Sequence, residues 1–426
     1  MPFYANLFTL FDLNLLIELR LKGNYAGLWE CHIQPDWLLI WEQNEEIKLI
    51  SLIRTGTHSD LLAVNKPKTI GKYMKLFLPK YFTLVGLIFT LSSCNGQVKQ
   101  KKIEDNITTG KIENPNGNVY CGFLDKDDNL WFGTTNDGVY KFDGSNFVHF
   151  TEKDGLSNNK ISCIYQVDNG DLWFGTANGI SIFNGTKFTH LKIPEYKIST
   201  DWLKKSYPMV NPNEVQSIVQ DKNGMYWIGT NGAGAYRYDG KSFTNHLSEI
   251  GDTMPDGLYH NVIQSITEDN NGNLWFASMS HGGVHKFDGK TFTQYMPKDG
   301  ISDDQIRIIN VDSKGIIWFG FNGNRESGLT SFNGNSFQTF TEKDGLCTKN
   351  VRAIYEDTQG NLWVGGMQGF CVSNGKEFTR FVDNKNVTYE RIVFIVGDKG
   401  DNIWFGGKNG FWKYDGEVVT DMTRVN

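Results

Sequence analysis

The chain has 426 residues, a formal net charge of −6 at pH 7, 46 glycines and only 10 prolines. Charges of both signs are spread along it and no large basic block occurs, which excludes the electrostatic footprint of a nucleic-acid-binding protein. Six cysteines are scattered without CxxC pairs, so the sequence contains neither a zinc ribbon nor a redox motif. Many glycines and few prolines indicate a chain rich in tight turns.

Residues 1–73 carry no copy of the repeat that fills the rest of the chain. They mix apolar runs such as Trp37–Trp41 with charges, and they precede a segment that normally stands at the start of a protein. We interpret them as upstream sequence translated before a true start at Met74. The alternative is a genuine cytoplasmic extension in which Tyr81–Leu91 is a buried strand.

Residues 74–93 have the anatomy of a secretory signal. Lys75 and Lys80 give a positive start, and Tyr81–Leu91 is an apolar core of eleven residues, too short for a bilayer span of about twenty. The following Leu-Ser-Ser-Cys resembles the lipobox of bacterial lipoproteins, which implies cleavage before Cys94 and lipid on its thiol. We therefore expect an exported protein held at a bacterial membrane, periplasmic or on the cell surface. The polar residues 94–117 are expected to form a flexible tether.

A repeat fills the chain from residue 118 to 424. An aliphatic or tyrosine residue, a tryptophan, an apolar residue and a small residue recur together, with spacings of 42, 54, 48, 43, 45 and 41 residues between successive tryptophans. The seven tryptophans are Trp131, Trp173, Trp227, Trp275, Trp318, Trp363 and Trp404. A period in the low forties with several short β segments per unit is typical of propeller blades.

Each unit predicts four short strands. An apolar segment ends in Asp at a turn of the type Asp269–Asn273, then comes the tryptophan segment, and a third segment ends in an Asp-Gly or Asn-Gly hairpin turn such as Asp288-Gly289. A fourth segment begins with phenylalanine in most units. Val167 replaces the turn aspartate in unit two. The small residue two places after each tryptophan indicates close approach of a neighbouring backbone.

These units predict a seven-bladed β-propeller of four-stranded antiparallel blades over residues 118–424. Four strands cannot bury both faces alone, so the repeated aromatic residues are expected to lie between blades and not on a binding surface. The pattern resembles the two-component regulator propeller repeat, found in periplasmic sensor halves of hybrid histidine kinases and in stand-alone lipoproteins. The resemblance implies binding of something outside the cytoplasm. No kinase or response regulator follows Asn426, so phosphotransfer is not carried over.

Strand alternation predicts that the loops after segments two and four share one face of the disc, and that this face holds the variable loops. Two insertions, 191–213 and 247–260, and two shorter loops, 278–281 and 322–326, fall on it. The candidate ligand-binding residues are Trp202, Tyr207, His281, Arg325 and Glu326. Trp202 is a platform for a sugar ring or an anchor for its own loop. Arg325 and Glu326 would grip a carboxylate or each other.

The sequence contains few residues in patterns typical of catalytic sites. His149, His190 and His246 fall on fourth segments, where solvated positions are expected, and His281 and His285 do not share a helical face. A seven-bladed lyase that opens cyclic peptide antibiotics is similar, and its chemistry needs a metal with a His/Glu pair; His281 with Glu326 is the best imitation here. No catalytic residue, metal ligand or cofactor is therefore predicted.

Two of the cysteines, Cys121 and Cys163, lie ten residues before their tryptophans, at equivalent positions of adjacent blades. Export makes disulfides permissible. Neighbouring inner strands diverge, however, and a bridge needs Cα atoms within about 7 Å. The expectation is free thiols, with Cys347 and Cys371 unpaired as well.

Three functions remain open. The first is a non-catalytic, membrane-anchored module that binds an extracytoplasmic ligand, such as a carbohydrate, or an envelope protein. The second is a lyase or hydrolase with a metal-assisted site on the loop-rich face, which predicts polar residues converging on the central channel. The third is a structural partner in an envelope complex, which predicts an exposed apolar patch.

Overall fold

The computed structural model describes residues 19–20, 29–34, 37–44, 49–57, 111–196, 211–248, 262–322, 327–408 and 410–423. The chain divides into two compact units, Met1–Gln100 and Lys101–Asn426. In the first unit an antiparallel sheet contains β1 (Leu19–Arg20), β2 (Trp29–Gln34), β3 (Trp37–Asn44) and β4 (Leu49–Thr57), in that order. The predicted signal and lipidation site, residues 74–94, lie outside the described residues.

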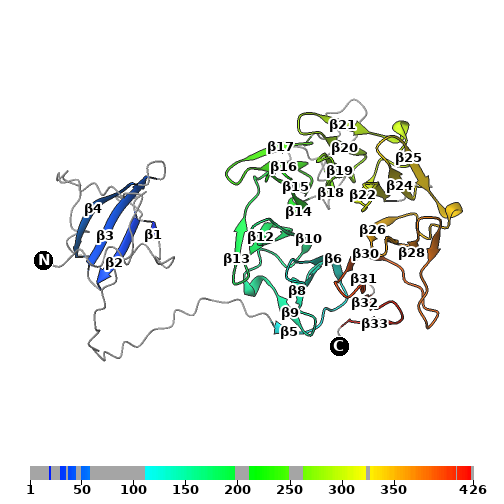
Figure 1. Cartoon of the computed structure of the whole chain (residues 1–426), viewed down its shortest axis with the longest axis horizontal. Coiled ribbons are helices and arrows are strands. Elements are labelled where there is room, and N and C mark those ends of the chain that lie inside the picture. The colour runs from blue at the N-terminus through cyan, green and yellow to red at the C-terminus, as the bar shows by residue number, and fades with distance from the viewer. Residues whose placement is uncertain are drawn as a thin grey trace, which may run out of the picture. The chain divides into compact units, whose positions relative to one another are not determined.

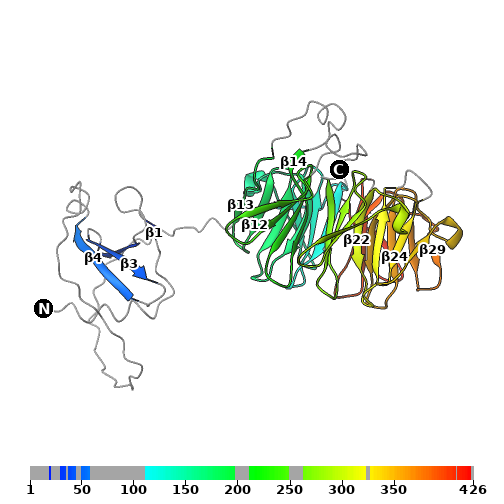
Figure 2. The ribbon, with the colours of Figure 1, turned by 90° about the horizontal axis from the view of Figure 1, so that it is seen from above.

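The second unit confirms the predicted seven-bladed propeller: seven antiparallel sheets follow one another around a ring (Figure 1) and stand side by side as the sectors of a disc (Figure 2). Within each blade the four strands pair in chain order, so each blade is one continuous stretch of sequence. The blades are β6 (Val119–Leu124), β7 (Leu130–Thr134), β8 (Val139–Phe142), β9 (Phe147–Phe150); β10 (Ile161–Gln166), β11 (Leu172–Thr176), β12 (Gly179–Phe183), β13 (Phe188–Leu191); β14 (Asn211–Gln220), β15 (Tyr226–Asn231), β16 (Ala235–Tyr238), β17 (Phe243–His246); β18 (Ile263–Glu268), β19 (Leu274–Ser278), β20 (Val284–Phe287), β21 (Phe292–Tyr295); β22 (Ile306–Val311), β23 (Ile317–Phe321), β24 (Leu329–Phe332), β25 (Phe337–Phe340); β26 (Val351–Glu356), β27 (Leu362–Gly366), β28 (Phe370–Ser373), β29 (Phe378–Arg380); and β30 (Ile392–Gly397), β31 (Ile403–Gly407), β32 (Gly410–Tyr414), β33 (Val419–Asp421).

A carboxylate fixes the tryptophan in six of the seven blades. In blade four, Asp269 Oδ1 accepts the backbone N–H groups of Asn271 and Asn273 at 2.9 Å, and Oδ2 accepts the indole N–H of Trp275 at 2.9 Å. The turn and the core side chain are thus held by one residue. The same pair, six residues apart, is found as Asp125–Trp131, Asp221–Trp227, Asp312–Trp318, Asp357–Trp363 and Asp398–Trp404. Blade two has Val167 at this position.

The tryptophans lie between blades, as predicted. Trp131 of blade one packs on Phe174 and Phe183 of blade two, with ring centroids 5.5 and 5.8 Å apart. The small residue after the tryptophan is needed for this contact, because a Cβ on Gly133 would lie 2.6 Å from Cγ2 of Ile161 in blade two. Burial of these aromatic faces between adjacent sheets supplies the core, since a single blade has no second layer of its own.

The ring closes by side-chain packing between the last blade and the first. Phe132 of blade one meets Phe411 of blade seven edge to face at 4.7 Å and Trp404 at 5.5 Å. In the described sheets no strand of one blade is contributed by the opposite end of the chain. Closure therefore uses the same kind of interface as the other six blade pairs.

A short strand from before the first blade covers its outer edge. β5 (Lys111–Ile112), within the stretch 94–117 expected to be a tether, pairs with β9. His149 of β9 is consequently buried: its ring stacks on Tyr140 at 4.1 Å, and its Nδ1 lies 2.7 Å from Glu113 Oε1. The expectation of a solvated His149 is wrong, because it took the fourth strand to be the edge of the sheet. His190 is exposed as expected.

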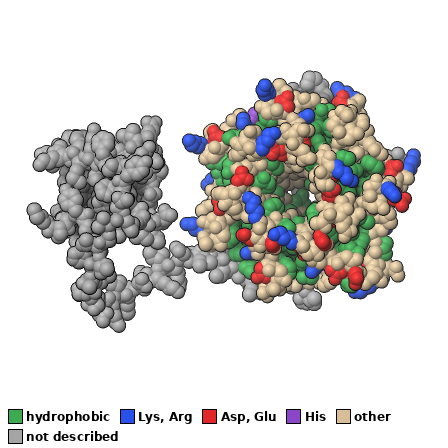
Figure 3. Space-filling view, viewed as in Figure 1, with side chains coloured by type: hydrophobic (Ala, Val, Ile, Leu, Met, Phe, Trp, Pro, Cys, Tyr) green, Lys and Arg blue, Asp and Glu red, His purple; other side chains and the backbone are tan. Residues whose placement is uncertain are grey.

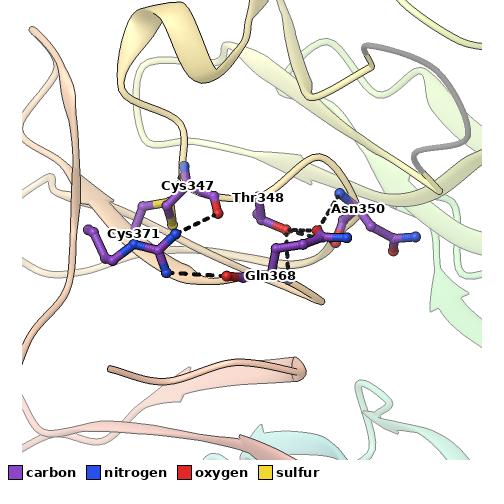
Figure 4. Close-up of a disulfide and its surroundings, with 6 residues drawn as sticks. Cys347, Thr348, Asn350, Gln368 and Cys371 are labelled. Carbon is purple, nitrogen blue, oxygen red and sulfur yellow. Dashed lines mark hydrogen bonds between the residues drawn. A yellow bond between two sulfur atoms is a disulfide. The ribbon is translucent and has the colours of Figure 1, made fainter. Parts of the chain in front are cut away.

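Cys347 and Cys371 form a disulfide with Cα atoms 5.9 Å apart (Figure 4), so the prediction that they are unpaired is wrong. Cys347 belongs to the connector entering blade six and Cys371 to β28, the third strand of that blade. The equivalent residues of blade two are Ser157 and Ser181, whose hydroxyls bond each other at 2.8 Å. The connector crosses the third strand in both blades, a contact that spacing from the tryptophans did not reveal. Cys121 and Cys163 are free, as predicted, and burial raises the pKa of both thiols.

Candidate functional site

A pocket of about 430 Å³ opens at the centre of the ring, where the space-filling view is hollowed (Figure 3). Its lining comes from first strands, from the connectors that enter them, and from the loops after second strands. Of these, the connectors and the loops after second strands are the segments predicted to share the variable face. The lining residues are Tyr120, Thr135, Lys160, Ile161, Glu214, Gln216, Asn231, Val262, Gln264, Met279, Ser280, His281, Gln305 and Arg307.

A β-bulge at the same place in each blade puts one extra residue on the innermost strand, and four of these residues line the pocket. In blade one, Val119 pairs with Thr134 but Cys121 pairs with Gly133, so Tyr120 is an extra residue on the innermost strand. A bulge re-aims a side chain without ending the strand. The same shift occurs in every blade, and the seven bulge residues are Tyr120, Ser162, Gln216, Gln264, Arg307, Arg352 and Val393. Tyr120, Gln216, Gln264 and Arg307 line the pocket.

On one side of the pocket, a buried carboxylate organises the polar groups. Glu214 Oε1 lies 2.7 Å from Lys160 Nζ and accepts the Gln216 amide at 2.6 Å, while Oε2 accepts Asn231 Nδ2 at 3.2 Å. Gln264 continues the chain by donating to Gln216 Oε1 at 2.8 Å. Because its negative charge is paired and its lone pairs are occupied, Glu214 is a fixed part of the wall.

Arg307 lines the other side of the pocket, and Arg352 of the adjacent blade is linked to it. Arg307 of β22 donates from Nη2 to Asn322 Oδ1 at 3.3 Å, and Arg352 of β26 donates from Nε to Asn350 Oδ1 at 3.0 Å. Asn350 in turn donates to the backbone oxygen of Asn322, so the two arginines of adjacent blades are connected through these two asparagines. Burial, together with the nearby Arg307 charge, lowers the pKa of Arg352 to about 10. Burial also lowers the pKa of Arg307.

His281 lies at the mouth, on the loop after β19, with its side chain 37% exposed. Its Nδ1 is 3.0 Å from Asp304 Oδ1, and the Gln305 amide lies 2.6 Å from its Nε2. An Nδ1–H that donates to Asp304 leaves Nε2 as the acceptor for the amide, so the ring is orientated by both neighbours. The adjacent Asp303 is buried, and this burial, followed by the proximity of Asp304, raises the pKa of its carboxyl.

His281 is therefore the predicted site residue that the structure places in the pocket. Trp202, Tyr207, Arg325 and Glu326 lie outside the described residues, as does the proposed lipidation site Cys94. The described start of the first insertion is anchored: the Tyr196 hydroxyl donates to the Ser248 carbonyl of the second insertion at 2.9 Å. Sequence reasoning missed the bulge residues, although each stands eleven positions before its blade's tryptophan, as Arg307 does before Trp318.

Within the described part of the chain, no group of three His, Cys, Asp or Glu residues could hold a metal ion. Nor does any helix there have the length and hydropathy to span a bilayer. The polar groups described at the pocket are thus the Glu214 network, the orientated His281, and Arg307, which is linked to Arg352 of the adjacent blade.

Comparison with known sequences finds two families along the chain. The two-component regulator propeller family matches residues 155–178, 210–232, 260–280 and 345–368, in blades two, three, four and six. A separate match, over residues 18–63, is to the bacterial toxin YafQ of type II toxin-antitoxin systems. The mRNA interferase toxin YafQ of Escherichia coli is 42% identical over 41 residues, which are 10% of this chain and 42% of the toxin.

Histidine kinase P4 of Formosa agariphila is 24% identical over 193 residues, which are 44% of this chain and 13% of that protein. Among solved structures, the extracellular domain of a proposed hybrid two-component system from B. thetaiotaomicron is 26% identical, with a TM-score of 0.57, covering 71% of this chain and 39% of that one. Streptogramin B lyase has a TM-score of 0.54 at 15% identity, covering 74% of this chain and 99% of its own, a likeness of fold alone.

The chain thus spans only a small part of the kinase and less than half of the two-component domain that it resembles. The repeat matches, the blade geometry and the extracellular two-component structure agree with one another. Blades two, three, four and six carry repeats that match the two-component regulator propeller family, and the propeller resembles the extracellular domains of hybrid two-component systems.

Proposed function

We propose that this propeller is a sensor-like binding module of the bacterial cell envelope, that it binds a small ligand in the axial pocket, and that lipid on Cys94 anchors it to a membrane. The observation that carries the proposal is the ring of β-bulges, which brings polar side chains from several blades into one concave site. A pocket of a few hundred cubic ångströms with a few convergent polar groups is the usual form of a small-molecule site.

Export is supported by two features besides the signal-like residues 74–93. The extracellular domain of the B. thetaiotaomicron protein has a similar fold. The Cys347–Cys371 disulfide suits an oxidising compartment. Residues 1–73 remain, in this proposal, upstream sequence unrelated to the propeller, and the separate match of residues 18–63 to another family supports that division.

Binding is tested by filling the pocket. Gln264→Trp places an indole where a bulge amide now lines the cavity, and Gln359→Trp places the same side chain at an exposed turn after a first strand, on the other face. The full chain is screened against sugars, amino acids and short peptides by thermal shift. At least one compound is expected to raise the Tm of the wild type and of Gln359→Trp but not of Gln264→Trp. Ligands that stabilise all three proteins equally would remove the pocket from the proposal.

Anchoring is tested separately by mass spectrometry of the protein recovered from membranes. A mature chain beginning at a lipidated Cys94 is expected, and Cys94→Ser should release the protein from the membrane fraction. An unmodified chain beginning at Met1 would refute the anchor and the proposed start.

The alternatives of an enzyme and a purely structural partner have less support. A metal-assisted lyase would use His281 with Glu326, but both ring nitrogens of His281 are engaged, by Asp304 and Gln305. The likeness to streptogramin B lyase extends to the fold alone.

A further inference from the structure

We propose that Arg307 and Arg352 form a receptor for an oxyanion, so that the ligand carries a carboxylate, sulfate or phosphate group directed to the side of the axial channel where blades five and six meet. This inference rests on the proposed ligand-binding function and adds the chemical class of the ligand.

The first argument is the surplus of donors. A guanidinium has five N–H groups and accepts none. Within the described residues, the side-chain acceptors are Asn322 and the Tyr120 hydroxyl for Arg307, and Asn350 for Arg352. The Nε of Arg307 is buried and has no hydrogen-bond partner among these residues. A buried donor left unpaired costs about 1–3 kcal/mol, so its presence in a folded protein calls for a partner that binds there.

The second argument is the missing counter-charge. Neither guanidinium forms an ion pair within 4.0 Å in the described part of the chain. Glu214, which lines the pocket, is already engaged by Lys160 at 2.7 Å, and Asp304 is engaged by the lining residue His281 at 3.0 Å. Two like charges placed side by side repel each other, and an anion bound between them offsets this repulsion by attracting both guanidinium groups.

The third argument is geometric placement. Arg307 and Arg352 occupy equivalent bulge positions on the innermost strands of adjacent blades, and Arg307 lines the pocket. The asparagine pair Asn322–Asn350 holds the two side chains as neighbours. Planar guanidinium forks match the oxygens of a carboxylate, sulfate or phosphate with paired hydrogen bonds, which a lysine ammonium does not. Ile161, Val262 and Met279 supply apolar wall for the rest of the ligand.

The test uses inorganic sulfate and D-galacturonate as anionic probes. Chloride at matched ionic strength is the control for sulfate, and uncharged D-galactose is the control for D-galacturonate. The proteins are the full chain and its Arg307→Gln, Arg352→Gln and Arg307→Lys variants. Arg391→Gln is the matched control, since Arg391 is an exposed arginine before β30. Comparing proteins in the same salt removes the general stabilisation that sulfate gives to any fold.

Isothermal titration and thermal shift are expected to detect binding of at least one anionic probe to the wild type and to Arg391→Gln. Loss of a charge-assisted pair of hydrogen bonds should weaken it about 10- to 100-fold in each Arg→Gln variant. Arg307→Lys should retain part of the affinity. Without anion, Arg307→Gln should be at least as stable as the wild type, because an unpaired donor and a like-charge repulsion are removed.

Anion binding that is unchanged in both Arg→Gln variants, or absent from the wild type, would overturn the inference. So would an Arg307→Gln protein that is less stable without anion, because the arginine would then have a structural role. The proposed function fails by a different result, namely a pocket that Gln264→Trp can fill without affecting any ligand. Neutral ligands that bind in the pocket with no dependence on either arginine would leave that function intact and overturn only the anion receptor.

Discussion

Replacing Asp269 by alanine should destabilise the propeller by about 3 kcal/mol, mainly through the loss of one buried hydrogen bond. Trp275 is 1% exposed, and its indole N–H donates to Asp269 Oδ2 at 2.9 Å. Water cannot replace that acceptor, so the unpaired indole N–H costs about 1–3 kcal/mol. The backbone N–H groups of Asn271 and Asn273 also lose Oδ1, at about 0.5 kcal/mol each because they lie nearer to solvent.

The matched control is Asp288→Ala in the same blade. Asp288 also accepts two backbone N–H groups, from Lys290 and Thr291 at 2.8 Å, but its turn is exposed and it holds no indole. Water replaces the lost acceptor there, and the cost should stay below about 1 kcal/mol.

The measurement is urea unfolding followed by tryptophan fluorescence, with thermal unfolding in parallel. For a domain of this size, 3 kcal/mol corresponds to a fall in Tm of about 5 °C. Equal destabilisation by Asp269→Ala and Asp288→Ala would show that the turn and not the indole contact carries the effect, and would refute the reasoning.

Three further predictions use the same unfolding assays. Cys371→Ser opens the disulfide and should cost about 3 kcal/mol, an effect that a reducing agent reproduces in the wild type but not in the variant. Gly175→Ala should cost more than about 2 kcal/mol, because its Cβ would lie 2.9 Å from the Val215 carbonyl oxygen. Ala277→Gly, at the equivalent position of blade four, should cost only about 1 kcal/mol. Comparable costs of the two substitutions would contradict the close-approach argument. Burial alone would raise the pKa of Asp269, but hydrogen bonds from Trp275 and Asn273 outweigh it and lower the pKa. The ionised carboxylate therefore stabilises the fold above about pH 4, and this stability is lost as the pH falls through the lower pKa of the folded state. The destabilisation by Asp269→Asn should shrink below about pH 4, and a cost independent of pH would argue against an ionised Asp269.

The blades were predictable because their signals are local. A tryptophan, a small residue and an Asp-Gly or Asn-Gly turn fix one hairpin within about twenty residues, and seven repetitions remove the ambiguity that a single copy would leave. The face carrying the pocket followed from strand alternation. The interpretation of the repeated aromatics as core is confirmed by residues such as Trp131, which packs on the following blade.

The site residues were harder to predict because a β-bulge has no sequence signature of its own. Gln216, Gln264 and Arg307 differ in side chain although their backbone position is the same. Only the register of the ladder shows that each is an extra residue on its strand. Attention to the variable loops therefore led to His281, which lines the pocket, and not to the bulge residues.

Long-range contacts account for the remaining errors. Cys347 meets Cys371 because the connector folds back across the third strand, and His149 is buried because β5 returns to the outer edge of blade one. Neither contact follows from residues adjacent in the sequence. The repeat therefore predicts the strands of each blade well, but it does not predict the contacts made by connectors or by segments that cover a blade edge.

The closure of the ring has a consequence for how such proteins change over time. Each blade is one uninterrupted stretch of chain, and the first and last are joined by contacts such as Phe132–Phe411 without exchange of a strand. A recombination event that duplicates, deletes or transposes about forty-five codons therefore moves an entire sector, including its contribution to the axis. By the same reasoning the ring can be cut between any two sectors, so relocating the termini to another connector is expected to yield a protein that folds and keeps its central cavity.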